Sequence, residues 1–252
     1  MKKLVSLLMA LTLVFACVGC GASGGNADSS ASAEDVKSEG VMTYDEYVAA
    51  ALDSEVVIEA YVQAKQSWWE DKATVYAQDK DGGYFLYNMA CSEDDYAKLT
   101  PGTKMKVTGF KAEWSGEVEI IDATFEIEDG NYVAAAEDVT SLLGSDDLIN
   151  HQNKFVSFKG MTVEAAGQDS SGNDVPFLYN WDGSGQEGDD LYFNVSSNGE
   201  TYTFTVESYL CDSSTDVYKA VQGLNIGDTV DMEGFLYWYE GVNPHITSLT
   251  VK

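Results

Sequence analysis

The sequence predicts a mainly β protein with two tandem five-stranded barrels, each carrying a short helix between its third and fourth strands. The first observation is an internal repeat: residues 99–110 and 224–235 align without gaps at an offset of 125, with leucine, glycine and phenylalanine at fixed places. The alternative is chance similarity between two strand–turn segments. The second observation is alternation of apolar and polar residues around both segments, which is typical of half-buried strands.

The first barrel is expected over residues 41–130. Thr43, followed three residues later by Glu46, has the pattern of a capping box that begins a helix ending near residues 53–54. The Gly- and Asp-rich residues 79–83 predict a hairpin turn between the second and third strands. The five strands are expected near 56–62, 73–77, 84–89, 104–107 and 118–127, with a short helix after Ser92.

The second barrel is expected over residues 137–252 and follows the same plan. An Asn-Gly pair within residues 196–200 predicts the equivalent hairpin. The strands are expected at 154–164, 191–195, 201–206, 230–237 and 246–251, with helices at 142–149 and 214–222.

Five strands with a helix between the third and fourth is the element order of the OB-fold barrel. The repeated leucine, glycine and phenylalanine segment, followed by a turn and a last strand, resembles strands four and five of OB domains in bacterial surface lipoproteins. The resemblance covers roughly residues 54–128 and 152–252. It implies a fold and a location outside the cytoplasm, and no catalytic motif comes with it.

The N-terminus has the three parts of a secretory signal: a basic start, an apolar run over residues 4–15 and small residues before a cysteine. Gly19 and Cys20 resemble a lipobox, which implies a signal peptide over residues 1–19 and lipidation of Cys20. Cleavage before Cys17 is the open alternative. Residues 20–40 are rich in Gly, Ser, Ala and acids, and predict a flexible tether with a reach of roughly 25 Å. We therefore expect a lipid-anchored protein on the extracytoplasmic face of a cell membrane.

The net charge is −28, and the chain contains no arginine. Nucleic-acid binding rests on Lys and Arg that neutralise phosphates, so no nucleic-acid partner is expected. The sequence shows no phosphate loop, no nucleophile elbow and no zinc-type histidine pair, and we expect no enzyme and no cofactor. The acidic loop at residues 165–189 could ligate calcium or simply be solvated. Cys91 and Cys211 are expected to be two buried free thiols rather than a disulfide.

All five tryptophans fall in or beside the loops that join strands one to two and four to five, the usual binding rim of an OB barrel. Exposed aromatic side chains often mark binding surfaces, although packing against the barrel is the competing interpretation. Of the pair at 68–69, at most one need be exposed, and Trp69 is expected to be the more buried. The candidate ligand-binding residues are Trp68, Trp69, Trp114, Trp181, Trp238 and Tyr239.

These residues favour a non-enzymatic module that binds a glycan, a cell-wall fragment or a peptide. The alternative is a structural or protein-interaction lipoprotein in which the aromatic loops form an interface. The aromatic side chains would suit binding of single-stranded nucleic acid, but the negative net charge opposes it. This function therefore ranks below both. The oligomeric state is left open.

Overall fold

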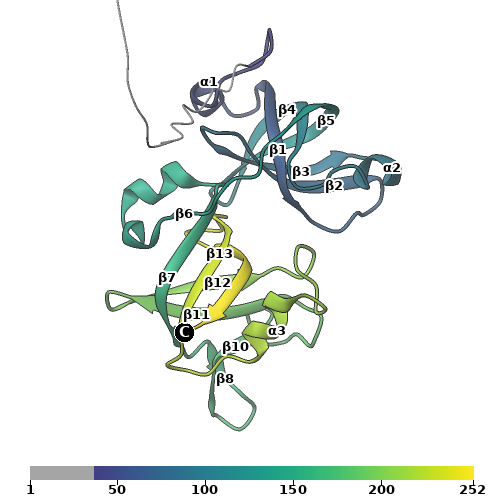
Figure 1. Ribbon diagram of the computed structural model, residues 1–252. Helices are drawn as coiled ribbons and strands as arrows, with labels where there is room; N and C mark the ends of the chain where they lie inside the picture. The colour runs from purple at the N-terminus through teal and green to yellow at the C-terminus, as the bar shows by residue number, and fades with distance from the viewer. Residues whose placement is uncertain (1–36) are drawn as a thin grey trace, which may run out of the picture. The chain divides into compact units, whose positions relative to one another are not determined.

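The computed structural model describes residues 37–252, which form two β-barrels in succession (Figure 1). The expected signal peptide and lipidated cysteine, and the tether up to residue 36, lie outside the described residues. None of the described helices is long and apolar enough to span a bilayer. The predicted mainly β fold with two tandem five-stranded barrels is confirmed.

The first barrel closes in the strand order β1-β2-β3-β5-β4, which is the OB order. β4 returns to pair antiparallel with β1, where Ile58 lies opposite Val107, so no strand of the ring keeps a free edge. Its elements are α1 (Tyr44–Ala49), β1 (Glu55–Lys65), β2 (Lys72–Gln78), β3 (Gly83–Ala90), α2 (Glu93–Tyr96), β4 (Thr103–Trp114) and β5 (Glu117–Asn131).

The second barrel repeats this ring with β7, β11, β12, β14 and β13, and closes because β11 also pairs with β7. The ring strands and the helix between the third and fourth of them are β7 (Phe155–Glu164), β11 (Leu191–Ser197), β12 (Glu200–Val206), α3 (Asp216–Gln222), β13 (Thr229–Phe235) and β14 (His245–Val251).

The helix predicted at 142–149 instead forms two 3-10 turns. The added pieces are β6 (Glu137–Asp138), η1 (Thr140–Leu142), η2 (Asp146–His151), β8 (Gly167–Gln168), β9 (Asp174–Val175) and β10 (Phe177–Tyr179).

Each barrel has its own apolar core, built from alternate residues of its strands. Cys91 packs in the first core and Cys211 in the second, and both are buried free thiols, as predicted. Burial raises the pKa of the Cys211 thiol to about 11, so it stays protonated at neutral pH.

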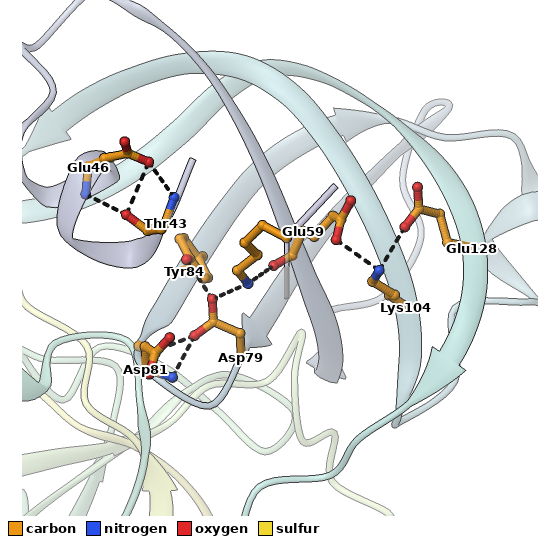
Figure 2. Close-up of polar contacts among 10 residues, drawn as sticks. Thr43, Glu46, Glu59, Asp79, Asp81, Tyr84, Lys104 and Glu128 are labelled. Atoms are coloured by element: carbon orange, nitrogen blue, oxygen red, sulfur yellow. Dashed lines mark hydrogen bonds and ion pairs between the residues drawn. The ribbon is translucent and has the colours of Figure 1, made fainter. Parts of the chain in front are cut away.

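The capping box predicted at the start of α1 is confirmed. The Thr43 hydroxyl accepts a hydrogen bond from the Glu46 backbone N–H, and the Glu46 carboxylate accepts one from the Thr43 backbone N–H (Figure 2). These contacts satisfy N–H groups that the first turn of a helix leaves without a partner.

The turn between β2 and β3 is built around the fully buried carboxylate of Asp79. It accepts hydrogen bonds from the backbone N–H groups of Asp81 and Gly82 and from the Tyr84 hydroxyl (Figure 2). The Lys37 ammonium completes the set at 2.7 Å. Contacts of the first barrel thus begin at Lys37, inside the segment 20–40 expected to be a tether.

Candidate functional site

The two barrels contact each other through a buried aromatic cluster on the outer face of β2, β3 and β13. Tyr76 stacks on Phe235 with ring centroids 4.3 Å apart and planes 15° apart, and Phe85 packs beside Tyr76 at 4.9 Å. The Gln78 side-chain oxygen accepts a hydrogen bond from the Phe155 backbone N–H at 2.7 Å. The outer face of the strand 2–3 hairpin of the first barrel, a face that OB barrels commonly use for binding, therefore meets the end of β13 and the start of β7 of the second barrel.

Trp69 stands at the tip of the hairpin that joins β1 to β2. Glu70 and Asp71 both have positive φ, 47° and 58°, the conformation of a tight type I′ turn, and Trp69 pairs with Lys72 across it. Adjacent extended residues point in opposite directions, so Trp68 and Trp69 separate here. The Trp68 indole N–H donates to the Cys91 carbonyl at 2.9 Å, while Trp69 is 67% exposed.

The sequence-based expectation that Trp69 would be the more buried of the pair is therefore wrong. The Cys91 backbone N–H also donates to the Asp71 carbonyl, so the hairpin tip is held on the end of β3 with the Trp68 side inward. Nothing in the local pattern of the two tryptophans distinguishes the inward ring from the outward one, because that choice depends on this contact with Cys91.

Trp114 and Tyr239 come from different barrels and lie side by side. Trp114 ends β4 just before a turn in which Ser115 and Gly116 have positive φ, and Tyr239 precedes the equivalent turn of the second barrel. The Glu240 backbone N–H donates to the Ser115 carbonyl at 2.7 Å, which joins the two turns. The two rings are consequently 5.1 Å apart, and each is about half exposed, at 54% and 47%.

Two adjoining cavities, of about 580 and 760 Å³, open over these strands. Both are lined by Trp114, Glu207, Tyr237 and His245, and we call the combined space the shared groove. Its first-barrel half is lined in addition by Gln66, Ser67, Trp69, Lys72, Thr74, Phe85, Tyr87, Asn88, Glu119 and Tyr209. Its second-barrel half is lined in addition by Ala166, Leu178, Trp181, Asp190, Tyr192, Asn194, Thr203, Thr205, Tyr239, Glu240 and Asn243.

The structure brings four of the six sequence-predicted aromatic residues to the shared groove: Trp69, Trp114, Trp181 and Tyr239. Trp181 is 76% exposed, in the long loop between β10 and β11. Trp68 and Trp238 have other roles. Trp238 packs against the second core, and its ring also lies against Gly116 of the first barrel.

Sequence reasoning missed the polar side chains at the junction of the two halves. Glu207, just after β12, accepts hydrogen bonds from the Gln66 amide at 2.9 and 3.0 Å, although the two residues are 141 positions apart. Burial raises the pKa of Glu207 to about 8, so its carboxyl is largely protonated at neutral pH. The predicted strand order could have marked Gln66, which follows β1 directly and therefore begins the rim loop.

His245 closes the floor of the junction. Burial lowers its pKa to about 3, so the ring is neutral at pH 7. The Tyr76 hydroxyl and Nδ1 of His245 form a hydrogen bond of 2.7 Å, which holds the imidazole ring in place. One face of the His245 ring stacks on Tyr237 with centroids 4.3 Å apart, and the Tyr237 ring lines the groove.

Glu117 is fully buried next to the groove, at the contact between the barrels. It accepts hydrogen bonds from the Trp238 backbone N–H at 2.9 Å and from the Gln152 amide at 3.3 Å. Burial raises its pKa to about 8. The contact between the barrels thus contains two carboxyls, Glu117 and Glu207, that are held in the neutral form by their surroundings.

The chemistry of the groove is aromatic, amide and carboxylic, with a single ammonium group, that of Lys72, among the lining residues. Within residues 37–252, no three His, Cys, Asp or Glu side chains are grouped in a way that would hold a metal ion. In the 165–189 loop, the Asp169 carboxylate instead accepts hydrogen bonds from the Ser171 and Asn173 backbone N–H groups of its own turn.

No family model matches the chain, and no curated protein matches it. Among solved structures, a murine DNA-binding protein bound to double-stranded DNA aligns with 77% of this chain and 94% of its own, at 10% identity and a TM-score of 0.35. The Ifi202 HINa domain in complex with double-stranded DNA aligns with 79% and 98%, at 11% identity and a TM-score of 0.33. A replication protein A heterotrimer bound to single-stranded DNA aligns with 79% and 49%, at 10% identity and a TM-score of 0.31.

These comparisons correct two expectations. The ranking of a glycan, cell-wall or peptide module above nucleic-acid binding is contradicted, and so is the expectation of no nucleic-acid partner, because the similar structures are of proteins bound to DNA. That expectation rested on the net charge and the absence of arginine, which do not describe a groove whose carboxyls are partly neutral. At identities of 10–11% and TM-scores below 0.5, what this chain binds has to be argued from its own groove.

Proposed function

We propose that the shared groove binds a ligand carrying nucleobases, through stacking of the bases on its exposed aromatic side chains. The observation that carries the proposal is the placement of Trp69, Trp114, Tyr239 and Trp181 along one groove, over the strand 2–3 faces of two OB barrels. Stacking on aromatic rings is the part of single-strand recognition that needs no positive charge, and it contributes about 1–3 kcal/mol per base.

The polar lining supports the same class of ligand. Asn88 and Asn243 line the groove with side-chain amides whose N–H groups can donate to the acceptors on the edge of an unpaired base. Phosphates are disfavoured, because Lys72 is accompanied by acidic residues such as Glu119 and Asp190. We therefore favour nucleosides or strands with few contacted phosphates, and an affinity that depends only weakly on salt.

The test is calorimetric titration of the full chain with nucleosides, nucleoside monophosphates, a single-stranded oligonucleotide and its duplex. Trp114→Ala should weaken nucleoside binding by about 10- to 100-fold, the equivalent of one stacked base. Phe110→Ala is the matched control, since Phe110 is an exposed aromatic residue of the same strand outside the groove lining. Absence of saturable binding to any nucleobase, or saturable binding of sugars alone, would overturn the proposal.

We further propose that the protein is a bacterial surface lipoprotein, anchored through Cys20 on the extracytoplasmic face of the cell membrane, and that it binds its ligand without catalysis. The support is the basic start, the apolar run and the lipobox-like Gly19 and Cys20. Metabolic labelling with a fatty-acid analogue should mark the protein. The label should disappear in Cys20→Ala and remain in Cys17→Ala, and the reverse pattern would place the anchor at Cys17.

A further inference from the structure

One acidic side chain of the shared groove, Glu119, is largely buried and has no hydrogen-bond partner within residues 37–252. Along β5, Val118 and Ile120 pack into the first core, so Glu117 and Glu119 both point out of the barrel, two residues apart. Glu117 is engaged by Trp238 and Gln152, as described above. Glu119 lies next to it, is 8% exposed and lines the groove together with Trp69 and Trp114.

Within residues 37–252 the Glu119 carboxylate accepts no hydrogen bond, and its oxygens keep some contact with solvent on the side of the groove. Buried carboxylates ordinarily accept several hydrogen bonds, because removing them from water without compensation is costly. Burial accordingly raises the pKa of Glu119. The open side of this carboxylate faces the groove, so a bound molecule with N–H donors would supply what the protein does not.

We propose that Glu119 is the specificity-determining residue of the groove and that it accepts two hydrogen bonds from the edge of a guanine base stacked on Trp114. An ionised carboxylate presents two acceptors in one plane and no donor. Guanine offers two adjacent N–H donors on its Watson–Crick edge, whereas on the corresponding edges of adenine, cytosine and uracil the donors alternate with acceptors. The inference rests on the proposed function and names the base within it.

A flat ligand is favoured over a simple cation by the groove around the carboxylate. Trp69, Trp114 and Tyr237 line it with aromatic rings, and Thr74 and Asn88 add small polar groups. A guanidinium compound would also present paired N–H donors, and it would gain from the negative charge. Binding of agmatine in place of guanosine is therefore one result that would overturn the inference.

The experiment is calorimetric titration of the full chain at pH 7 with guanosine, inosine, adenosine and agmatine. Guanosine should bind at least about tenfold more tightly than adenosine, the difference that one good pair of hydrogen bonds to a base provides. Inosine, which lacks the second donor, should fall between them. This comparison needs no variant, so it remains decisive even if a substitution at 119 disturbs folding.

Glu119→Gln should remove the preference for guanosine while leaving adenosine binding within about twofold, since an amide presents one acceptor and one donor group. Glu113→Gln is the matched control, because Glu113 is an exposed acid on the neighbouring strand outside the groove lining. An unchanged preference in Glu119→Gln would overturn the role of Glu119 and leave nucleobase binding standing. Failure of every nucleoside to bind the unaltered protein would instead overturn the proposed function itself.

Discussion

Replacing Gly83 with alanine should separate the two barrels, lower the free energy of unfolding by about 3 kcal/mol and abolish binding in the shared groove. Gly83 begins β3, and a methyl group on its Cα would lie well inside van der Waals contact with the Asn153 carbonyl group and 2.5 Å from the Lys154 nitrogen. These are backbone atoms of the second barrel, so no side-chain rotation can make room.

The damage would spread to the groove through Gln78. It pairs with Gly83 across the β2–β3 hairpin and accepts the Phe155 hydrogen bond of the second barrel. Urea denaturation and calorimetric titration measure the two effects. Gly223→Ala is the control, since its φ is −90° and the nearest atom to the added carbon is 3.5 Å away. Stability within about 0.5 kcal/mol of the unaltered protein, with binding retained, would show that the barrels do not depend on this contact.

The free energy of unfolding should fall as the pH rises from about 5 to 8, most steeply above pH 6.5. Glu117 and Glu207 keep their protons in the folded protein up to about pH 8, whereas the unfolded chain releases them near pH 4.5. In this window the folded state binds more protons, so each group reduces stability by up to about 1.4 kcal/mol per pH unit. His245 opposes them between about pH 3 and 6.5, because it is neutral when folded and protonated when unfolded.

Glu117→Gln isolates one of these contributions. The amide keeps the shape and an acceptor for the Trp238 N–H, and it has no proton to lose. Urea denaturation at half-unit steps between pH 5 and 8.5 should show the slope above pH 6.5 reduced by about 1.4 kcal/mol per pH unit relative to the unaltered protein. The exposed variant Glu113→Gln should leave the slope as it was. If both variants gave the same slope as the unaltered protein, burial of Glu117 would not be the source of the pH dependence.

The fold could be predicted from the sequence because its determinants are local. The Gly- and Asp-rich segment at 79–83, the Asn-Gly pair within 196–200 and the repeated glycines each specify a turn, and alternation specifies the strands between the turns. The helix expected at 142–149 was the weaker case, since a short apolar pattern with Gly144 inside it supports two 3-10 turns as well as one helix.

The candidate site could be predicted only in part, because it depends on how two barrels meet. The rim aromatics Trp69, Trp114, Trp181 and Tyr239 were found by their positions in loops. The junction was not, since Gln66 and Glu207, like Ser115 and Glu240, are joined by contacts between residues more than a hundred positions apart. The choice between Trp68 and Trp69 was lost for a different reason: it is decided within the first barrel, by the Cys91 carbonyl just after β3.

The link between the Ser115 and Glu240 turns has a consequence for how long a ligand stays bound. A direct hydrogen bond joins the turns, and the two half-grooves share lining residues, so they adjoin one another. A ligand long enough to occupy one half therefore meets the other half at a high effective concentration, and must leave both before it escapes. Under the proposed function, the chain length of the ligand should then govern its dissociation rate, and the base stacked on Trp114 should govern which ligands enter.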